Sequence, residues 1–378
     1  MGRRILPRRS IGCATAIDAT APVLPRYPTV TRRRICVRKG VAGLIAAVGI
    51  ATGGAVAVQA QNGAAPKTAT AKPALSRDIL HVQVILDHLG FPPGPLDGRE
   101  GPGLTAALKA FQITRQIPVT GKPDARTLQA LHAHRAIRPT RIVRLTSEML
   151  AGPFIRPWPR DAQAQAKLKT MGYRSALEKL AEMFHTTPQV LIELNSPDTR
   201  LAPGVPVEFP NAIPASQAFP GDMKPEWRKT LTDLNVNAVQ PKANRIVVDK
   251  SDKVLRVFDG KGMLAAQFNV TTGSKRDPLP IGSWKVNGVA TNPDFHYNPK
   301  LFWDVSDKKP DALLPPGPNS PVGVVWIDLS KEHYGIHGTP EPHLIGRSES
   351  HGCIRLTNWD AARLALMVSP GTPVIFQE

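Results

Sequence analysis

The side chains best suited to covalent chemistry lie in two short segments near the end of the chain. They read Ile336-His337-Gly338-Thr339 and Ser350-His351-Gly352-Cys353-Ile354-Arg355-Leu356. Cys353 follows His337 by sixteen residues, so a loop that folds back can bring the thiol and the imidazole together. A thiolate attacks carbonyl carbon, and it needs a base to take its proton or a cation to stabilise it. The pair therefore predicts a cysteine nucleophile with His337 as its base.

The residues around this pair fit the same chemistry. His337 needs an acceptor on its other ring nitrogen, and no carboxylate lies next to it in sequence, so we expect a backbone carbonyl to orient it. The amides of Gly352 and Cys353 are candidates for an oxyanion hole, because glycine allows close backbone approach. Arg355 is suited to bidentate pairing with a substrate carboxylate.

The beginning of the chain predicts export. A cluster of arginines and Lys39 precedes the small, apolar run Val41–Val58, and Val58-Gln59-Ala60 offers a cleavage site. This layout is typical of a secretory signal over residues 1–60. An uncleaved membrane anchor is the alternative, because the run of about 18 residues is at the lower limit for spanning. In both cases we expect the rest of the chain in the periplasm or cell envelope.

Export would leave Cys353 as the single cysteine, because Cys13 and Cys36 precede the cut. A lone thiol in an oxidising compartment is at risk of damage, which indicates a chemical role for it. Residues 1–60 hold ten Lys and Arg and one Asp, so their removal lowers the formal net charge from +18 to +9. A basic exported protein suits anionic envelope polymers and lipid head groups. Nucleic acid is not an expected partner, since no basic stripe with interleaved aromatics is present.

Residues 61–75 are rich in Ala, Pro, Thr and Lys, and predict a flexible linker. Residues 76–133 show three apolar patterns of helical period, separated by turns. We expect Gly90 to end the first helix, and Asp97-Gly98 to form a tight turn in which Gly98 takes a positive φ. The pattern predicts a compact unit of three helices.

The order of motifs in this unit closely resembles the three-helix peptidoglycan-binding domain. The matching residues are Leu89-Gly90-Phe91, Gly94-Pro95-Leu96-Asp97-Gly98, Gly101, Thr105, Ala110-Phe111-Gln112, Gly121 and Asp124-Ala125-Arg126-Thr127-Leu128. The resemblance implies a module that holds cell-wall glycan-peptide without a metal. A scaffold that no longer binds the wall remains the alternative.

Residues 173–211 predict a second small unit of mixed α/β class. Two short helices, Asn195, a Pro-Gly turn and a strand to Pro210 make it similar to a LysM module. The usual opening strand and Gly-Asp-Thr turn are not clear, since Met171–Ser175 stands there. Glycan binding and a scaffold role therefore both stay open, and residues 212–240 are interpreted as a connector.

Residues 243–378 predict a mainly-β domain, either a β-sandwich or a closed sheet, because many short strands alternate with turn signals. The expected strands cover 245–249, 254–258, 266–273, 284–289, 323–329, 334–338 and 374–376. One helix is expected over 359–367, capped by Thr357 or Asn358.

This last unit strongly resembles the YkuD-like L,D-transpeptidase catalytic domain. The resemblance rests on the two segments around His337 and Cys353, with Ile345-Gly346-Arg347 and smaller matches at Thr272-Gly273, Leu279-Pro280-Ile281-Gly282 and Pro373-Val374. It implies that Cys353 is the acylated nucleophile, that His337 is its general base, and that the carbonyl of Gly338 orients the imidazole. It also implies that Ser350, His351 and Arg355 shape the pocket. Tyr334 and Trp303 are candidates to line the cleft.

The reaction implied is a ping-pong acyl transfer without a cofactor. Cys353 attacks the carbonyl of the L-centre of meso-diaminopimelate in a tetrapeptide stem, D-Ala leaves, and an amine resolves the thioester. A second diaminopimelate would give a 3→3 cross-link; lipoprotein lysine, a D-amino acid or water are other acceptors. Carbapenem β-lactams are expected to acylate the same thiol.

Other classes of protein remain open at this stage. Long, mixed spacings argue against a zinc site among the histidines near Cys353. A wall-binding protein with a silent catalytic unit is one alternative, and an L,D-carboxypeptidase is another. A papain- or NlpC-like peptidase is a third, although those families place the cysteine before the histidine along the chain.

Overall fold

The computed structural model describes residues 74–301, 305–306 and 308–378. Three helices open this part of the chain: α1 (Arg77–His88), α2 (Pro102–Thr114) and α3 (Ala125–His132). The predicted signal over 1–60 and linker residues 61–73 lie outside the described residues. No helix in the described part of the chain is long and apolar enough to cross a membrane.

Side-chain caps define the N-terminal ends of two of the three helices in the first unit. The Ser76 hydroxyl accepts a hydrogen bond from Ile79 N at 3.3 Å and caps α1, and the Asp124 carboxylate does the same for α3 at Thr127 N, at 3.0 Å. Gly98 has φ +66°, as its Asp-Gly turn predicted. Buried Leu86, Leu108 and Phe111 lie in the core between the helices.

The second unit begins earlier in the chain than the predicted boundary at residue 173. Its strand β2 (Pro206–Pro210) pairs antiparallel with β1 (Thr140–Arg144), and α5 (Ala176–Met183) and α6 (Pro188–Leu194) lie between them in sequence. The strand that pairs with β2 therefore lies about thirty residues before the predicted start of the unit. An insertion containing α4 (Ala162–Gln165) separates it from α5.

The last unit is built on a mixed sheet of eight strands with the spatial order β11-β10-β9-β6-β12-β3-β4-β5. The strands are β3 (Arg245–Asp249), β4 (Val254–Phe258), β5 (Leu264–Asn269), β6 (Gly282–Thr291), β9 (Val325–Leu329), β10 (Gly335–His337), β11 (Ile354–Arg355) and β12 (Pro373–Gln377). The mainly-β prediction is confirmed. The sheet also curls on itself, because Thr271, just after β5 at one edge, bridges to Arg355 in β11 at the other.

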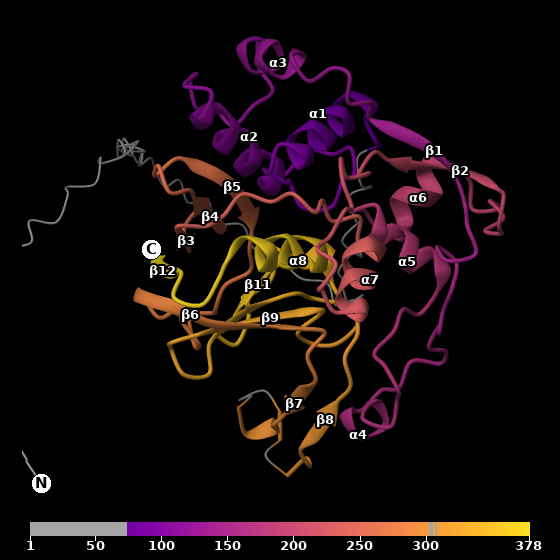
Figure 1. Ribbon diagram of the computed structural model, residues 1–378, viewed down its shortest axis with the longest axis vertical. Helices are drawn as coiled ribbons and strands as arrows, with labels where there is room; N and C mark the ends of the chain where they lie inside the picture. Colours follow the sequence, from indigo (N-terminus) through magenta and orange to yellow (C-terminus); the bar gives the residue numbers. More distant parts are fainter. Residues whose placement is uncertain (1–73, 302–304, 307) are drawn as a thin grey trace, which may run out of the picture. The chain divides into compact units, whose positions relative to one another are not determined.

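Helices and a hairpin complete the domain (Figure 1). Helix α8 (Asn358–Met367), capped by the Thr357 hydroxyl, packs against β9, β10 and α5. The predicted connector 212–240 contains α7 (Pro225–Asp233), whose buried Trp227 and Leu231 join the core of the sheet domain. The remaining elements are the hairpin β7 (Phe295–Tyr297) and β8 (Ala312–Leu314), and the short 3-10 helices η1 (Pro299–Leu301) and η2 (Pro342–Leu344).

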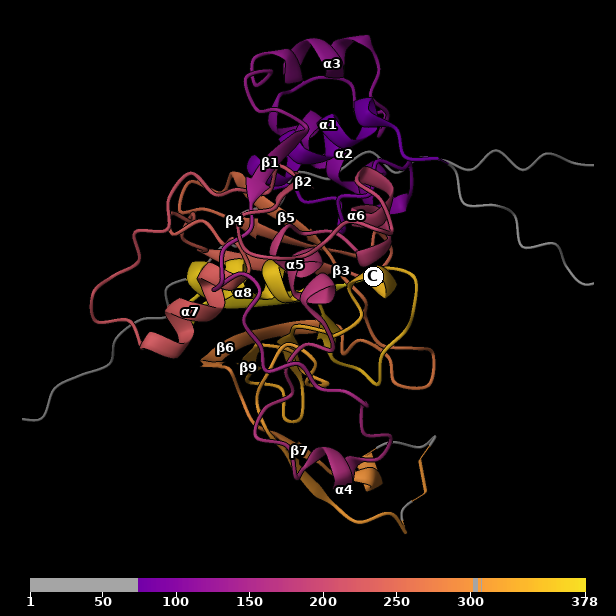
Figure 2. The same cartoon turned by 90° about the vertical axis from the view of Figure 1, so that its right-hand side faces the viewer.

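The three-helix unit lies along the β5 edge of the sheet, as both views show (Figure 1, Figure 2). Gln267 in β5 donates its backbone N–H to the carbonyl of Gly90 at 3.0 Å and its side-chain amide to Ala106 O at 2.9 Å. Asn269 donates to Pro92 O at 3.2 Å. The unit therefore covers an edge strand that would otherwise expose unpaired backbone groups.

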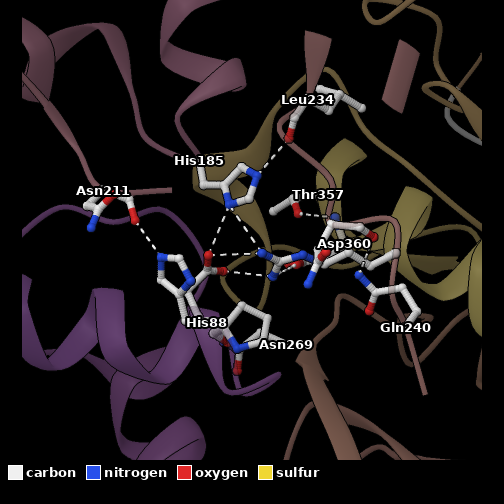
Figure 3. Close-up of polar contacts among 12 residues, drawn as sticks. His88, His185, Asn211, Leu234, Gln240, Asn269, Thr357 and Asp360 are labelled. Atoms are coloured by element: carbon white, nitrogen blue, oxygen red, sulfur yellow. Dashed lines mark hydrogen bonds and ion pairs between the residues drawn. The ribbon is translucent and has the colours of Figure 1, made fainter. Parts of the chain in front are cut away.

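A buried charged cluster joins the three units (Figure 3). Arg363 of α8 donates two hydrogen bonds, of 2.8 and 2.9 Å, to the Asp87 carboxylate of α1. His185, between α5 and α6, lies 3.1 Å from Asp87 and 2.8 Å from the carbonyl of Leu234, which follows α7. Burial alone would raise the pKa of Asp87, but Arg363 and His185 outweigh it and hold that pKa well below its usual range.

We expect Arg363→Met to destabilise the protein by about 3–5 kcal/mol, because it leaves the Asp87 carboxylate buried without its cation. The double variant Asp87→Leu/Arg363→Met should lose less than the sum of its two single changes. Urea unfolding followed by circular dichroism measures both.

Lys250→Met is the matched control, because it breaks an ion pair with Glu378 in which the side chains are 33% and 71% exposed. We expect a cost of about 0–1 kcal/mol there. Equal losses for Arg363→Met and Lys250→Met would contradict a structural role for the buried pair.

Candidate active site

The two reactive segments are brought together by strand pairing. Strands β10 and β11 run parallel, with Ile336 opposite Ile354 and His337 opposite Arg355. Ile336 and Ile354 are fully buried in the core. Because side chains alternate along a strand, His337 and Arg355 share the opposite face. Cys353 directly precedes β11, and its thiol receives a hydrogen bond from the backbone of Gly335 in β10, two residues before His337. The pairing thus brings the segments of the predicted base and nucleophile side by side.

His337 is held in one tautomer. Its Nδ1 lies 2.7 Å from the carbonyl oxygen of Gly338, and a carbonyl can only accept, so Nδ1 carries the proton. Nε2 is then left with its lone pair, as a base requires. Burial lowers the pKa of His337 to about 3, Arg355 acts in the same direction, and the bond to Gly338 opposes them. The imidazole is therefore neutral near neutral pH.

Cys353 is a half-buried free thiol immediately before β11. Its Sγ donates a hydrogen bond to the carbonyl of His333 at 3.8 Å. Burial raises the pKa of the thiol, while a hydrogen bond from the Gly335 backbone and the charge of Arg355 lower it. The resting pair consists of a protonated thiol and a neutral imidazole.

Ser350 shapes the turn before Cys353. Its hydroxyl donates to the Cys353 carbonyl at 2.6 Å and accepts from Gly352 N at 3.2 Å, and the residue is 4% exposed. Ser350 thus holds the backbone of the nucleophile loop, and the Gly352 amide already has an acceptor. Of the two amides predicted for an oxyanion hole, that of Cys353 remains as the candidate.

Tyr334 lies beside Gly352 and the Cys353 thiol. A β-carbon on Gly352, where φ is +110°, would lie 2.9 Å from Tyr334 Cε1, so glycine is required beneath that ring. Burial raises the pKa of Tyr334, and the neighbouring Cys353 adds to this, which places the phenol beside the thiol. His351 is half-buried between Ser350 and Gly352. Trp303 lies outside the described residues.

Sequence reasoning missed Trp326, whose ring stacks on His337. The two ring centroids are 5.5 Å apart with 19° between the planes, and Trp326 is the direct partner of His337 across β9 and β10. The imidazole therefore has one face covered by an indole. Only the pairing of two strands reveals this contact, because nothing in the local sequence marks Trp326.

Asn358 was expected only as a helix cap, yet it supports the base. Its Oδ1 accepts from Val324 N at 3.2 Å, and a β-carbon on Gly338 would lie 2.2 Å from the same oxygen. Its side-chain amide donates to Glu182 Oε1 of α5 at 2.8 Å. The peptide that orients His337 thus rests on a side chain that is itself held by the second unit.

In the described ranges, no three His, Cys, Asp or Glu side chains come close enough to hold a metal ion.

Two family models match this chain, one over the first helices of the described residues and one over the sheet domain. Residues 243–376 match the YkuD model, the L,D-transpeptidase catalytic domain, and residues 76–131 match the "Putative peptidoglycan binding domain" model. The first covers the curled sheet with His337 and Cys353, and the second covers the three helices. Neither of these two models covers the unit containing β1, α5, α6 and β2.

Individual proteins similar to this chain include L,D-transpeptidases by name. The chain is 52% identical over 59 residues to the "Putative L,D-transpeptidase YkuD" of Bacillus licheniformis, which is 16% of this chain and 36% of that protein. The chain thus spans about a third of the length of this relative. A solved L,D-transpeptidase from Mycobacterium smegmatis is 23% identical, with a TM-score of 0.29 over 35% of this chain and 58% of that one.

A longer match comes from Fuscovulum blasticum. Its "Putative L,D-transpeptidase in ATP synthase subunits region ORF 5" is 30% identical over 129 residues, which cover 34% of this chain and 67% of that protein. With the matching catalytic model over the strands that carry His337 and Cys353, this relative shows that the chain belongs to the L,D-transpeptidase family.

Proposed function

We propose that this protein is a peptidoglycan L,D-transpeptidase that works through a thioester on Cys353. The observation that carries the proposal is the hydrogen bond between His337 Nδ1 and the Gly338 carbonyl, because it leaves Nε2 with the lone pair that a general base needs. Membership of the family and the matching peptidoglycan-binding domain support the substrate class.

The chemistry follows from the neutral resting pair. His337 Nε2 takes the thiol proton as Cys353 Sγ attacks the carbonyl of the L-centre of meso-diaminopimelate. The bond to the D-Ala nitrogen breaks, the imidazolium returns the proton to that nitrogen, and D-Ala leaves a thioester. An acceptor amine then attacks, loses its proton to His337, and releases Cys353 as the thiol.

Arg355 stabilises the thiolate that this proton transfer produces. Its positive charge lowers the pKa of the Cys353 thiol and stabilises the thiolate as it forms. The same charge opposes an imidazolium at His337, so the proton is held there only briefly. We propose the Cys353 amide as the donor to the oxyanion.

The other parts of the chain fit an envelope enzyme. We propose that residues 1–60 direct export to the periplasm or cell envelope and that the three-helix unit binds peptidoglycan. The β-α-α-β order of β1, α5, α6 and β2 supports a LysM-like module with a displaced first strand. The acceptor would be a second stem or an envelope lipoprotein lysine, and carbapenems would acylate Cys353.

The first test incubates the full chain with disaccharide-tetrapeptide and follows products by mass spectrometry. We expect loss of D-Ala and a dimer joined 3→3. Cys353→Ala should reduce product to background with an unchanged melting temperature, because only the nucleophile is removed.

His337→Gln is the companion variant and should slow acylation by about 10²–10⁴-fold, the usual contribution of a general base. Tripeptide without dimer would indicate an L,D-carboxypeptidase or a missing acceptor. Turnover by Cys353→Ala would exclude the proposed mechanism.

The pKa directions predict how thiol alkylation by iodoacetamide depends on pH. Since the pKa of Cys353 is raised and that of His337 is about 3, the rate should fall about tenfold per pH unit from about pH 8 to pH 5. A plateau across that range would instead indicate a stored thiolate–imidazolium pair. Arg355→Gln should slow alkylation at a fixed pH, because the loss of its charge raises the thiol pKa further.

Asn358 is predicted to act as a positioning residue. Asn358→Ala removes the support beneath the Gly338 peptide and should lower kcat by about 10–100-fold with little change in KM, since small misplacements of a base are costly. Steady-state kinetics with tetrapeptide measures this.

Glu182→Gln keeps an acceptor for the Asn358 amide and should retain most of kcat, whereas Glu182→Leu removes it and should resemble Asn358→Ala. Wild-type kcat in both Asn358→Ala and Glu182→Leu would show that the link between α5 and the base has no catalytic importance.

A further inference from the structure

A cavity of about 350 Å³ lies where the three-helix unit meets the sheet domain. On one side it is lined by the loop and first turn over 93–104, and on the other by the β3–β4 turn and by residues 343–347. Its volume is that of a small-molecule or short-peptide site. Its lining includes neither His337 nor Cys353, so the proposed reaction leaves it unused.

The walls of the cavity are fixed by hydrogen bonds across the junction. Gln267 and Asn269 bind the backbone of the three-helix unit beside it, and Lys253 Nζ donates to Gly346 O at 3.0 Å. Within the helical unit, the Gln83 side chain accepts from the amides of Asp97 and Gly98 at 2.9 and 2.7 Å. The cavity is therefore preorganised, which lowers the entropic cost of binding.

One side of the cavity is formed by the chain segment that connects the two candidate catalytic residues. Ile345, Gly346 and Arg347 belong to the segment that links His337 to Cys353 along the chain. Gly346 N donates to Thr271 Oγ1 at 3.0 Å, and Thr271 exchanges backbone hydrogen bonds of 3.0 and 2.9 Å with Arg355. A ligand in the cavity would thus contact the loop whose far side is anchored beside the nucleophile.

The charges of the lining indicate the ligand. Asp252 is neutralised by Arg256, and Arg99 by Glu193 at 2.5 Å. Lys253 donates to a neutral carbonyl, so its charge is not compensated there. With the exposed Arg347, it gives the sheet side of the cavity a positive character, whereas Asp97 and Glu100 place two carboxylates on the helical side. The sheet side therefore favours carboxylates, which arginine binds in bidentate geometry.

The apolar part of the lining is aliphatic. Pro93, Pro102, Leu104 and Ile345 contribute, and none of the described lining residues is Trp, Tyr or Phe. The broad flat face that an aromatic ring would offer to a sugar is thus missing. A peptide with carboxylates fits this lining better than a glycan.

We infer that this junction cavity binds the carboxylate-bearing stem peptide of a peptidoglycan strand, with Arg347 as its main anion contact. The inference rests on the proposed function for its substrate. It assigns the ligand to a composite site that the helical unit and the catalytic domain form together. The peptidoglycan strand would then be bound next to the loop that leads to Cys353.

The test measures binding of disaccharide-tetrapeptide to the full chain carrying Cys353→Ala, by isothermal titration calorimetry. Adding Arg347→Glu should weaken binding at least about tenfold, whereas Arg347→Lys should keep most of the affinity. A tetrapeptide with amidated carboxyl groups should bind the parent weakly and be insensitive to Arg347→Glu.

Lys261→Glu, in the exposed turn between β4 and β5, makes a matching charge reversal outside the cavity and should leave the affinity unchanged. Equal affinities for the Arg347→Glu variant and the parent would overturn the inference. If the chain with Cys353 intact still forms the cross-linked dimer, the proposed function survives that result. Absence of both binding and turnover would overturn both.

Discussion

The buried contact between Asp87 and Arg363 is the constraint on which the rest of the structure depends. Arg363 and the carboxylate of Asp87 are each costly to remove from water, and only their bidentate geometry, with His185 completing the cluster, offsets that cost. Because the partners come from α1, α8 and the turn between α5 and α6, the charges are satisfied only when all three units are docked. The helical unit is thereby part of the catalytic body and is not a module on a loose tether.

This docking reaches the chemistry through side chains that are not themselves reactive. Helix α8 supplies Arg363 to the junction and Asn358 to the peptide of Gly338, while α5 supplies Glu182 to Asn358. The orientation of His337 therefore depends on the same helix that joins the units. The helical unit, which we propose to bind the wall, and the catalytic sheet are therefore held in a fixed relation to each other.

The sequence predicted best those features that depend on residues close together along the chain. Strands 245–249 and 254–258 were placed to the residue, because strong alternation and a polar turn mark both their ends. The candidate reactive residues could be singled out because they lie in two short segments. Strand β1 was missed since it is short and arginine-rich and its partner is 62 to 70 residues away, between Arg144↔Pro206 and Thr140↔Pro210. The contacts of Trp326, Asn358 and Gly352 were equally hidden, because each depends on segments that meet only in the fold.

The protonation state of the active site explains how a single thiol can be carried outside the cytoplasm, where we propose this enzyme works. Oxidants attack thiolate much faster than thiol, so a cysteine that stored its thiolate would be damaged between turnovers. Here burial raises the pKa of Cys353 and lowers that of His337, and the pair rests uncharged. The thiolate then forms mainly when a bound carbonyl is ready to accept it, with Arg355 stabilising the charge at that moment. Burial of the pair thus slows the reaction of the Cys353 thiol with oxidants in the free enzyme. The reactive thiolate forms mainly once substrate is bound.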